Sequence, residues 1–268
     1  MEASGPAINP ADLRGILNYV PKFLGQTFVI ALDGALIEHD NLPNILLDIA
    51  VLRSLQIKVI IVHGIGKQLA DLSQERSIPI SNADGSGPTD KATLDLAIRA
   101  SSRVSHQILE GLTQSALKCA IGNSVRAKPI GIIKGTDYMF GGKVDLIDTD
   151  FLNHLIAQNI IPIVSPIGFD RNGRTLRINS DLLATEIAGA VDATKIIYLT
   201  EKSGIAIDDQ FKRQIPIKEL EAFLESPEAQ SLEPNLLSKA QHALKGVNQG
   251  VARIHILDGR IHDGLIQE

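Results

Sequence analysis

The fold is decided by residues 27–62, TFVIALDGALIEHDNLPNILLDIAVLRSLQIKVIIV. The runs TFVIAL (27–32) and IKVIIV (57–62) are almost continuously apolar and rich in β-branched residues, which predicts two strands buried on both faces. Between them, Ile45, Ile49 and Leu52 recur at helical spacing. This order predicts two neighbouring parallel strands joined by a crossover helix.

The same alternation continues to the C-terminal end of the sequence. Further buried strands are expected at residues 117–121, 160–165, 195–200 and 252–257, and helices at residues 69–75, 89–112, 149–158, 179–190 and 235–247. DRNG at 170–173 predicts a hairpin turn, and residues 77–89 and 201–216 are expected to form loops over the sheet ends. We therefore predict an α/β fold with a central, mainly parallel sheet covered by helices on both faces.

Composition excludes several classes of function. The chain has 268 residues, 44% hydrophobic and 21% charged, as expected of a globular protein, and its net charge of -5 gives no basic surplus for nucleic acid or an anionic membrane. The single cysteine, Cys119, excludes an internal disulfide and a cysteine metal cluster. No apolar run is long enough to span a bilayer, and residues 1–9 lack the features of a secretory signal. We expect a cytoplasmic protein without a metal site.

Glycine loops follow the first two predicted strands. In open α/β sheets, ligands bind beyond the carboxyl ends of the strands. Gly34 follows the first strand, and Gly64 and Gly66 follow the second. Backbone N–H groups at such loops can meet an anion, so these glycines are candidates for a phosphate or substrate loop. HGIGKQL only partly matches a dinucleotide motif, because its third position is Leu69, and the sequence has no P-loop motif.

Three further polar residues are candidates for the site. Asn179 either caps the following helix or belongs to the ligand loop. Asp181 would lie in the first turn of that helix, where the helix dipole favours a carboxylate, or would organise cationic groups around a phosphoryl group. Lys239 lies on an amphipathic helix, where a lone lysine is usually solvated. None of these residues identifies a function by itself.

Together the motifs resemble the amino-acid kinase superfamily, in particular acetylglutamate kinase and the kinase-like domain of bacterial N-acetylglutamate synthase. The matching stretches, in order, are FVIALDGALIEHDN, KVIIVHGIGKQL, GPTDKATLDLA, GNSVRAKPIGIIKGTDY, IPIVSPIGFDRNGRTLRINSDLLATEIA, KIIYLTEKSGI and ARIHILDGRIHDGLIQE. The resemblance covers residues 13–268. It implies a three-layer sandwich forming one domain (1–268), with an amino-acid-side lobe over about 25–165 and a nucleotide-side lobe over about 166–268.

The sequence departs from the active kinases of this family at four positions. In those kinases the first strand ends in a lysine that neutralises the transferring phosphoryl group, followed by a Gly-Gly loop. Here Ala31 stands at the position of the lysine and Asp33 at that of the first glycine. Ile65 interrupts the second glycine loop, and Gly87 stands where the family has an arginine for the substrate carboxylate. Lys67 is a weaker candidate to replace the missing charge.

These departures favour the synthase branch, whose kinase-like domain transfers no phosphoryl group and is followed by an acetyltransferase domain, expected after residue 268. Arginine-inhibited members carry an additional N-terminal helix that interlaces dimers into a hexamer, and residues 9–24 resemble it. The resemblance implies an arginine site at Tyr19, Lys239, His255 and Glu268, although ordinary packing explains Tyr19 and His255 equally well. We expect a homo-oligomer, dimeric or hexameric, that binds L-arginine or N-acetylglutamate.

The alternative is an acetylglutamate kinase, which transfers the γ-phosphate of Mg-ATP to N-acetyl-L-glutamate. Two family positions support it, because Asp181 matches the organising aspartate and Lys239 matches the cation on the nucleotide side. In that case these two residues are catalytic and Mg-ATP is required. Otherwise no cofactor is expected.

Overall fold

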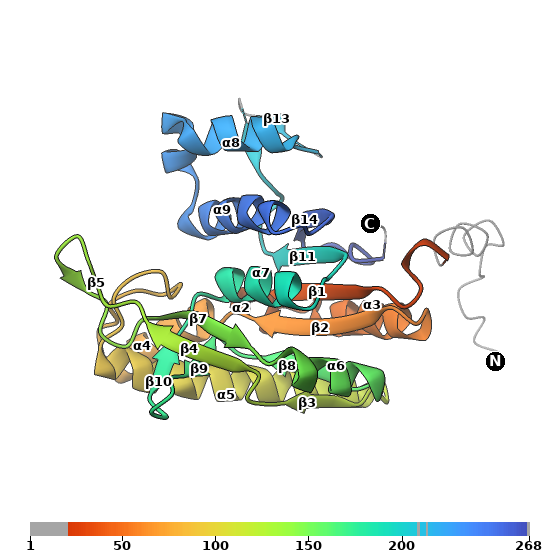
Figure 1. Cartoon of the computed structure of the whole chain (residues 1–268), viewed down its shortest axis with the longest axis horizontal. Coiled ribbons are helices and arrows are strands. Elements are labelled where there is room, and N and C mark those ends of the chain that lie inside the picture. The colour runs from red at the N-terminus through yellow and green to blue at the C-terminus, as the bar shows by residue number, and fades with distance from the viewer. Residues whose placement is uncertain (1–20, 208–209, 213, 267–268) are drawn as a thin grey trace.

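The computed structural model describes residues 21–207, 210–212 and 214–266. Its centre is a six-stranded sheet in the order β14-β11-β1-β2-β8-β3 (Figure 1). The strands are β1 (Thr27–Leu32), β2 (Lys58–His63), β3 (Cys119–Ile121), β8 (Ile161–Val164), β11 (Lys195–Thr200) and β14 (Arg253–Asp258). Every neighbouring pair in this sheet is parallel, which confirms the predicted parallel sheet.

Helices cover both faces of the sheet because both faces are apolar. The helices are α2 (Gly34–Ile37), α3 (Leu42–Ser54), α4 (Gly66–Arg76), α5 (Lys91–Gln114), α6 (Thr149–Ala157), α7 (Ser180–Ala190), α8 (Ile217–Glu225) and α9 (Pro234–Asn248). On one face, Ile30 belongs to a core shared with α2, α3, α4 and α5. On the other face, Val29 belongs to a second core shared with α6 and α7. The predicted three-layer sandwich is therefore confirmed.

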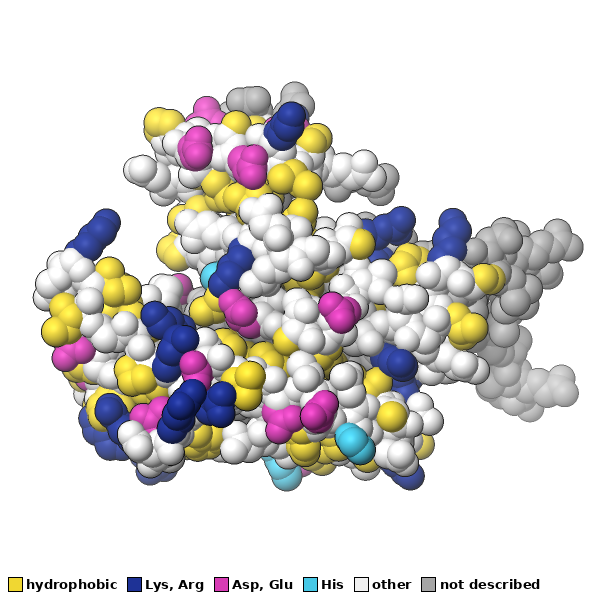
Figure 2. Space-filling view, viewed as in Figure 1, with side chains coloured by type: hydrophobic (Ala, Val, Ile, Leu, Met, Phe, Trp, Pro, Cys, Tyr) yellow, Lys and Arg dark blue, Asp and Glu magenta, His cyan; other side chains and the backbone are white. Residues whose placement is uncertain are grey.

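A smaller sheet lies on the α7 side of the molecule, with the order β10-β9-β4-β7. Its strands are β4 (Val125–Pro129), β7 (Gly142–Ile147), β9 (Ile167–Phe169) and β10 (Thr175–Arg177). The predicted DRNG turn joins β9 to β10, and the Asp170 carboxylate accepts hydrogen bonds from the backbone of Asn172 and Arg174. Between β4 and β7, the hairpin of β5 (Ile132–Ile133) and β6 (Thr136–Asp137) projects from the body, and hydrophobic side chains show at its tip (Figure 2).

The segment after β11 differs from the predicted loop. It contains the short strands β12 (Ala206–Ile207) and β13 (Gln210–Phe211), and it is followed by α8 and a 3₁₀ helix (Pro227–Ser231), which the sequence analysis did not predict. These elements form a small apolar core of their own against α9, which includes Ile207, Leu220 and Phe223. In Figure 1, α8 stands above α9 and away from the main sheet.

Most of the helix predicted over residues 9–24 lies outside the described residues. Within the part that the structure describes, residues 21–23 are helical. No helix in the described part of the chain is both long enough and apolar enough to cross a membrane.

Candidate functional site

A pocket of about 360 Å³ opens beyond the carboxyl ends of β1 and β2. The beginnings of α2, α4 and α7 reach it, together with part of the loop between α4 and α5. The predicted site residues that line it are Gly34, Gly64, Gly66, Asn179 and Asp181. The structure therefore brings together the glycine loops and the start of α7, which are far apart in the sequence.

The glycines allow two loops to pack backbone against backbone. A Cβ atom on Gly34 would lie 2.5 Å from Oε1 of Gln68 and 3.2 Å from the carbonyl oxygen of Gly64. A Cβ atom on Gly64 would in turn lie 3.2 Å from the backbone nitrogen of Gly34. The close approach of these loops, which only glycine permits, fixes the shape of the pocket floor.

Asn179 acts as the cap of α7. Its Oδ1 accepts a hydrogen bond from the backbone N–H of Leu182 at 2.9 Å, and its Nδ2 donates to the carbonyl oxygen of Asp84 at 3.1 Å. The capping alternative is thus confirmed, and the same side chain also ties the 77–89 loop to α7. Asp181, two residues later, lies in the first turn of the helix and is buried.

Asp181 lies in a buried triad with Lys239 and Asp33. The Nζ atom of Lys239 donates to Oδ1 of Asp33 at 2.7 Å and to Oδ1 of Asp181 at 3.1 Å. Only 1% of the Lys239 side chain is exposed. Burial raises the pKa of the Asp181 carboxyl, against the attraction of Lys239. Burial would lower the pKa of Lys239, but the two carboxylates outweigh it and the pKa is raised. The cation is therefore held charged and fully used by the chain itself.

Two neighbours on α9 complete the triad. Asn235 donates to Oδ2 of Asp33 at 2.8 Å and accepts from Lys239 at 2.6 Å, and Ser238 donates to Oδ2 of Asp181 at 2.7 Å. The sequence analysis missed both residues. Ser238 and Lys239 follow Asn235 by three and four residues, so both lie next to it on the surface of the helix, and this pattern could have revealed them.

Two other lysines near the pocket are shared in the same way. Lys67 bonds to Asp71 and lies 3.7 Å from Glu38. Lys202 lies 2.8 Å from Glu233 and 3.9 Å from Glu201, and both of these glutamates line the pocket. We call Lys67, Lys202 and Lys239 the shared lysines, since each faces two carboxylates. Lys67 therefore does not supply the free charge that was considered for it.

The pocket does not match the needs of a nucleotide phosphate. Ala31, at the position of the family's lysine, ends in a methyl group that belongs to the core on the α7 face. The shared lysines each face two carboxylates, and Asp33 and Asp181 line the pocket. Among the described residues, no group of three potential ligand side chains is arranged to hold a metal ion. The donor set thus disagrees with Mg-ATP, and we derive no reaction step through it.

The residues predicted to bind L-arginine are not all brought together. His255 pairs in register with Ile197 of the α3 and α5 core, whereas its neighbours Ile254 and Ile256 pack on the opposite core. Helix α9 covers that opposite face, because Gly246 approaches Ile254 closely. The sheet therefore separates Lys239 from His255. Tyr19 and Glu268 lie outside the described residues.

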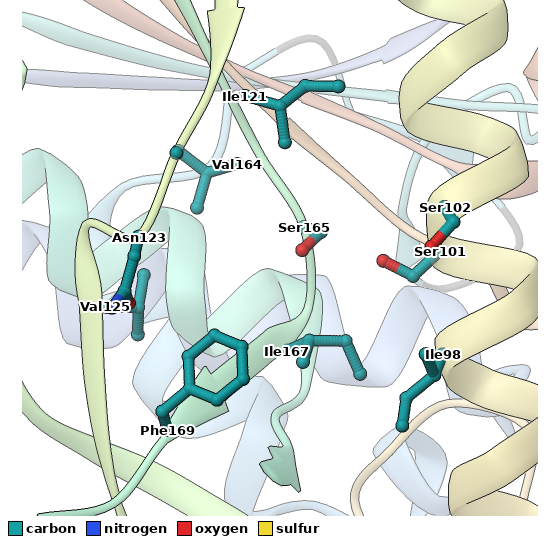
Figure 3. A pocket seen from close by; sticks show the side chains of 11 residues that line it. Ile98, Ser101, Ser102, Ile121, Asn123, Val125, Val164, Ser165, Ile167 and Phe169 are labelled. Carbon is teal, nitrogen blue, oxygen red and sulfur yellow. The ribbon is translucent and has the colours of Figure 1, made fainter. Parts of the chain in front are cut away.

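A second cavity of about 250 Å³ lies between α5 and the ends of β3, β8 and β9. Figure 3 shows Ser101 of α5 and Ser165 facing this space, with Ile98, Ile167 and Phe169 at its edge. No ionisable side chain lines it, so it offers hydroxyl and amide groups but no charge for acid, base or phosphate chemistry.

Comparison with known proteins agrees with this architecture. The profile of the amino acid kinase family matches residues 26–258. An amino-acid acetyltransferase from Ralstonia nicotianae is 30% identical over 272 residues, which cover 94% of this chain but 60% of that protein. An acetylglutamate kinase from Prochlorococcus marinus is 31% identical over 268 residues, which cover 96% of this chain and 85% of the kinase.

Solved structures give the same result. Two crystal structures of N-acetylglutamate synthase from Neisseria gonorrhoeae, one with coenzyme A and N-acetyl-glutamate and one with coenzyme A and L-arginine, match with a TM-score of 0.89. Their identities are 26% and 25%, and each match covers 98% of this chain but only 61% or 63% of the synthase. This chain thus spans about three-fifths of the synthase. It belongs to the amino acid kinase family, with acetylglutamate kinases and N-acetylglutamate synthases as its relatives.

Proposed function

We propose that this chain is the kinase-like domain of an N-acetylglutamate synthase-type protein of arginine biosynthesis, that it transfers no phosphoryl group, and that it binds L-arginine as a regulatory and assembly module. The observation that carries the proposal is the triad, in which Asp33 and Asp181 both bind Lys239, the residue that the resemblance assigns as the cation on the nucleotide side.

Phosphoryl transfer depends on positive charge at the transferring group. Ala31 supplies none, and a phosphate that approached Lys239 would have to displace a carboxylate 2.7 Å from its Nζ atom. Asp33 comes from the end of β1 and Lys239 from α9, so displacement would also disturb the contact between these two elements. These features support a binding role for the scaffold.

Arginine binding is supported by the relatives and not by the pocket. One of the two N. gonorrhoeae synthase structures contains L-arginine. We place the arginine site of this chain at Tyr19, His255 and Glu268, and we leave Lys239 out because the sheet separates it from His255 and two carboxylates already bind it. A carboxylate such as Glu268 suits the planar fork of a guanidinium.

The remaining parts of the proposal follow the family pattern. The domain would comprise residues 1–268, with an amino-acid-side lobe (25–165), a nucleotide-side lobe (166–268), and a helix over 9–24 that joins subunits into dimers or hexamers. We place the protein in the cytoplasm. Light scattering of the full chain and of a variant lacking residues 1–20 tests the assembly. If the helix joins subunits, the truncated variant should form particles with fewer subunits than the full chain.

Thermal unfolding with L-arginine tests the ligand. A ligand that binds only the folded state raises the free energy of unfolding, by about 2.7 kcal/mol when its concentration is a hundred times its Kd, and therefore raises the unfolding midpoint. We expect a rise with L-arginine, none with ATP, and a smaller rise with L-arginine for Glu268→Gln. Glu225→Gln is the matched control, since Glu225 is an exposed glutamate on α8. An equal response of both variants would remove Glu268 from the site.

The alternative, acetylglutamate kinase activity, has its own test. If the chain is a kinase, N-acetyl-L-glutamate and Mg-ATP together release ADP at a rate typical of metabolic enzymes, and Asp181→Asn abolishes the release. Such turnover would refute the proposed binding role. The triad predicts no release above that of a sample without N-acetyl-L-glutamate.

A further inference from the structure

Helix α3 carries an acidic residue on its buried face. The buried residues of this helix are Ile45, Leu46, Asp48, Ile49 and Leu52. Asp48 is 5% exposed, and among the described residues no cation acts on its carboxylate. A buried carboxylate without a cation is costly, so it needs hydrogen-bond donors or a proton. The proposed function gives this residue no role.

The donors come from the 259–266 segment, which follows β14. The backbone N–H groups of Leu265 and Ile266 donate hydrogen bonds to the Asp48 carboxylate. The side chain of Leu265 is buried in the same core as the apolar residues of α3. One end of the segment is therefore held on α3 by an ionisable side chain.

The other end of the segment is held by groups that do not ionise. The Nδ2 atom of Asn41, which precedes α3, donates to the carbonyl oxygens of Gly259 at 2.8 Å and Ile261 at 3.1 Å. Gly259 packs closely on α2, because a Cβ atom there would lie 2.4 Å from Cδ1 of Leu36. These contacts are the same at any pH at which the chain is folded, so only the contact at Asp48 can respond to protons.

A second carboxylate lies in the segment itself. Burial is the main cause that raises the pKa of Asp48 to about 6, and repulsion by Asp263 adds to it, against the hydrogen bonds from the segment. A proton on Asp48 removes both costs, because a neutral carboxyl is cheaper to bury and does not repel Asp263. If the segment leaves, water reaches Asp48 and its pKa returns towards the ordinary value of 3.8.

The other charged groups on the elements that pack here do not act on Asp48. Most of them have partners of their own, namely Arg53 with Ile57, His106 with Glu110, Glu38 with Lys67, His39 with Asn41, His262 with Asn44, and Arg260 with Asp258. On β14, Arg253 lies over the ring of Phe23, and His255 points to this side of the sheet. The histidines titrate in the same pH range as Asp48, so a test has to separate them from it.

We propose that Asp48 is a proton-operated latch, which keeps the 259–266 segment docked on α2 and α3 when it is protonated and releases it more readily when it ionises. The latch goes beyond the proposed function, since it requires neither a ligand nor a second subunit. A group whose pKa is higher in the docked state favours docking at low pH, and this advantage is lost as the pH rises through about 6. Between pH 5.0 and pH 7.5, the docking equilibrium should weaken about tenfold.

Hydrogen exchange of the full chain, measured by mass spectrometry in the peptide that contains residues 259–266, reports the docking. After correction for the intrinsic pH dependence of exchange, protection of this peptide should be about tenfold higher at pH 5.0 than at pH 7.5. Asp48→Asn cannot ionise, so its protection should be equal at the two pH values. Asp95→Asn neutralises an exposed aspartate of α5 and, as the matched control, should keep the tenfold change.

Asp263→Asn tests the latch with Asp48 in place. Asp263 is exposed and has a φ of 58°, a left-handed conformation that asparagine adopts readily, so this variant should fold. Its substitution removes the repulsion that raises the pKa of Asp48. The loss of protection should therefore begin at a lower pH than in the unmodified chain.

Each outcome decides the proposal. Equal protection of the unmodified chain at the two pH values overturns it, as does an unchanged pH profile in Asp263→Asn. A tenfold change that persists in Asp48→Asn also overturns it, because the dependence would then belong to His39, His255 or His262. The first two results stand even if Asp48→Asn does not fold. Loss of the thermal shift with L-arginine would refute the proposed function and leave the latch unaffected.

Discussion

The triad predicts a non-additive response to mutation, which can be worked out from its distances. Lys239 lies 2.7 Å from Asp33 and 3.1 Å from Asp181, so the two bonded oxygens are no more than 5.8 Å apart, the sum of these distances. At an effective dielectric constant of about 20, the attractions are about 6 and 5 kcal/mol and the repulsion between the carboxylates is at least about 3 kcal/mol. Each acid is thus stabilised by Lys239 and destabilised by the other acid.

Single neutral substitutions should therefore cost less than the attraction that they remove. Asp33→Asn and Asp181→Asn each lose one attraction but relieve the repulsion, which leaves a Coulomb cost of at most about 3 kcal/mol each. The double variant loses both attractions and leaves Lys239 buried without a counter-ion. Its loss should exceed the sum of the single losses by about 3 kcal/mol, which is the coupling energy of the two acids.

Urea unfolding at neutral pH measures the four free energies of the cycle. Asp95→Asn, which removes an exposed partner of Lys91 on α5, is a control that should cost less than about 1 kcal/mol. If the loss of unfolding free energy in the double variant equals the sum of the two single losses, the carboxylates do not share one cation and the reasoning about the triad is wrong. If either single variant loses more than the double, the triad is not an electrostatic unit.

Three further changes test other parts of the structure. Burial lowers the pKa of His63 from 6.5 to about 4, so its neutral form stabilises the fold above pH 6.5 and this contribution disappears as the pH falls to 4. Over that pH range, the free energy of unfolding of the native chain should fall by about 3 kcal/mol more than that of His63→Gln. Parallel curves of unfolding free energy against pH for the two proteins would contradict this. Gly34→Ala should cost about 1–3 kcal/mol in denaturant unfolding because its Cβ would meet the neighbouring loop, whereas Gly66→Ala, with its nearest contact at 3.4 Å, should cost less. Ala31→Lys alone should give no ADP release with Mg-ATP and N-acetyl-L-glutamate, because Asp33 would pair with the new ammonium group. If the single variant releases ADP and the double variant Ala31→Lys/Asp33→Gly does not, then Asp33 does not neutralise the added lysine.

The central sheet could be predicted from the sequence because parallel strands buried on both faces appear as continuous apolar runs. Residues 27–32 and 57–62 fall within one residue of β1 and β2. Strand β4 was missed because VRAKP mixes charged and small residues and lies in a partly exposed sheet. Helix α8 was missed although Leu220 and Phe223, three residues apart, form its buried stripe. That stripe is short and packs only on a small local core, so it gives a weak signal in a linear scan.

The position of the candidate pocket could also be predicted, because the ends of parallel strands meet at one edge of the sheet. The sequence could not show what its charges do. Asp33 was identified only as a departure from the family's first glycine, whereas the structure pairs it with a lysine 206 residues away. The sequence analysis assigned no role to Arg177, whose guanidinium is buried beside the pocket because residues 82 and 83 approach it. Long-range pairing of this kind requires the folded chain.

The triad explains how the proposed binding module would keep its architecture without a bound nucleotide. Asp33 places a permanent negative charge against Lys239 of α9 directly after β1, so the contact between these elements does not depend on a nucleotide. Buried ion pairs add little net stability, but they can fix orientation, because a displaced partner would be left charged and unsolvated. A permanent link suits a rigid binding module, whereas an enzyme that must admit and release phosphates at each turnover would be hindered by it.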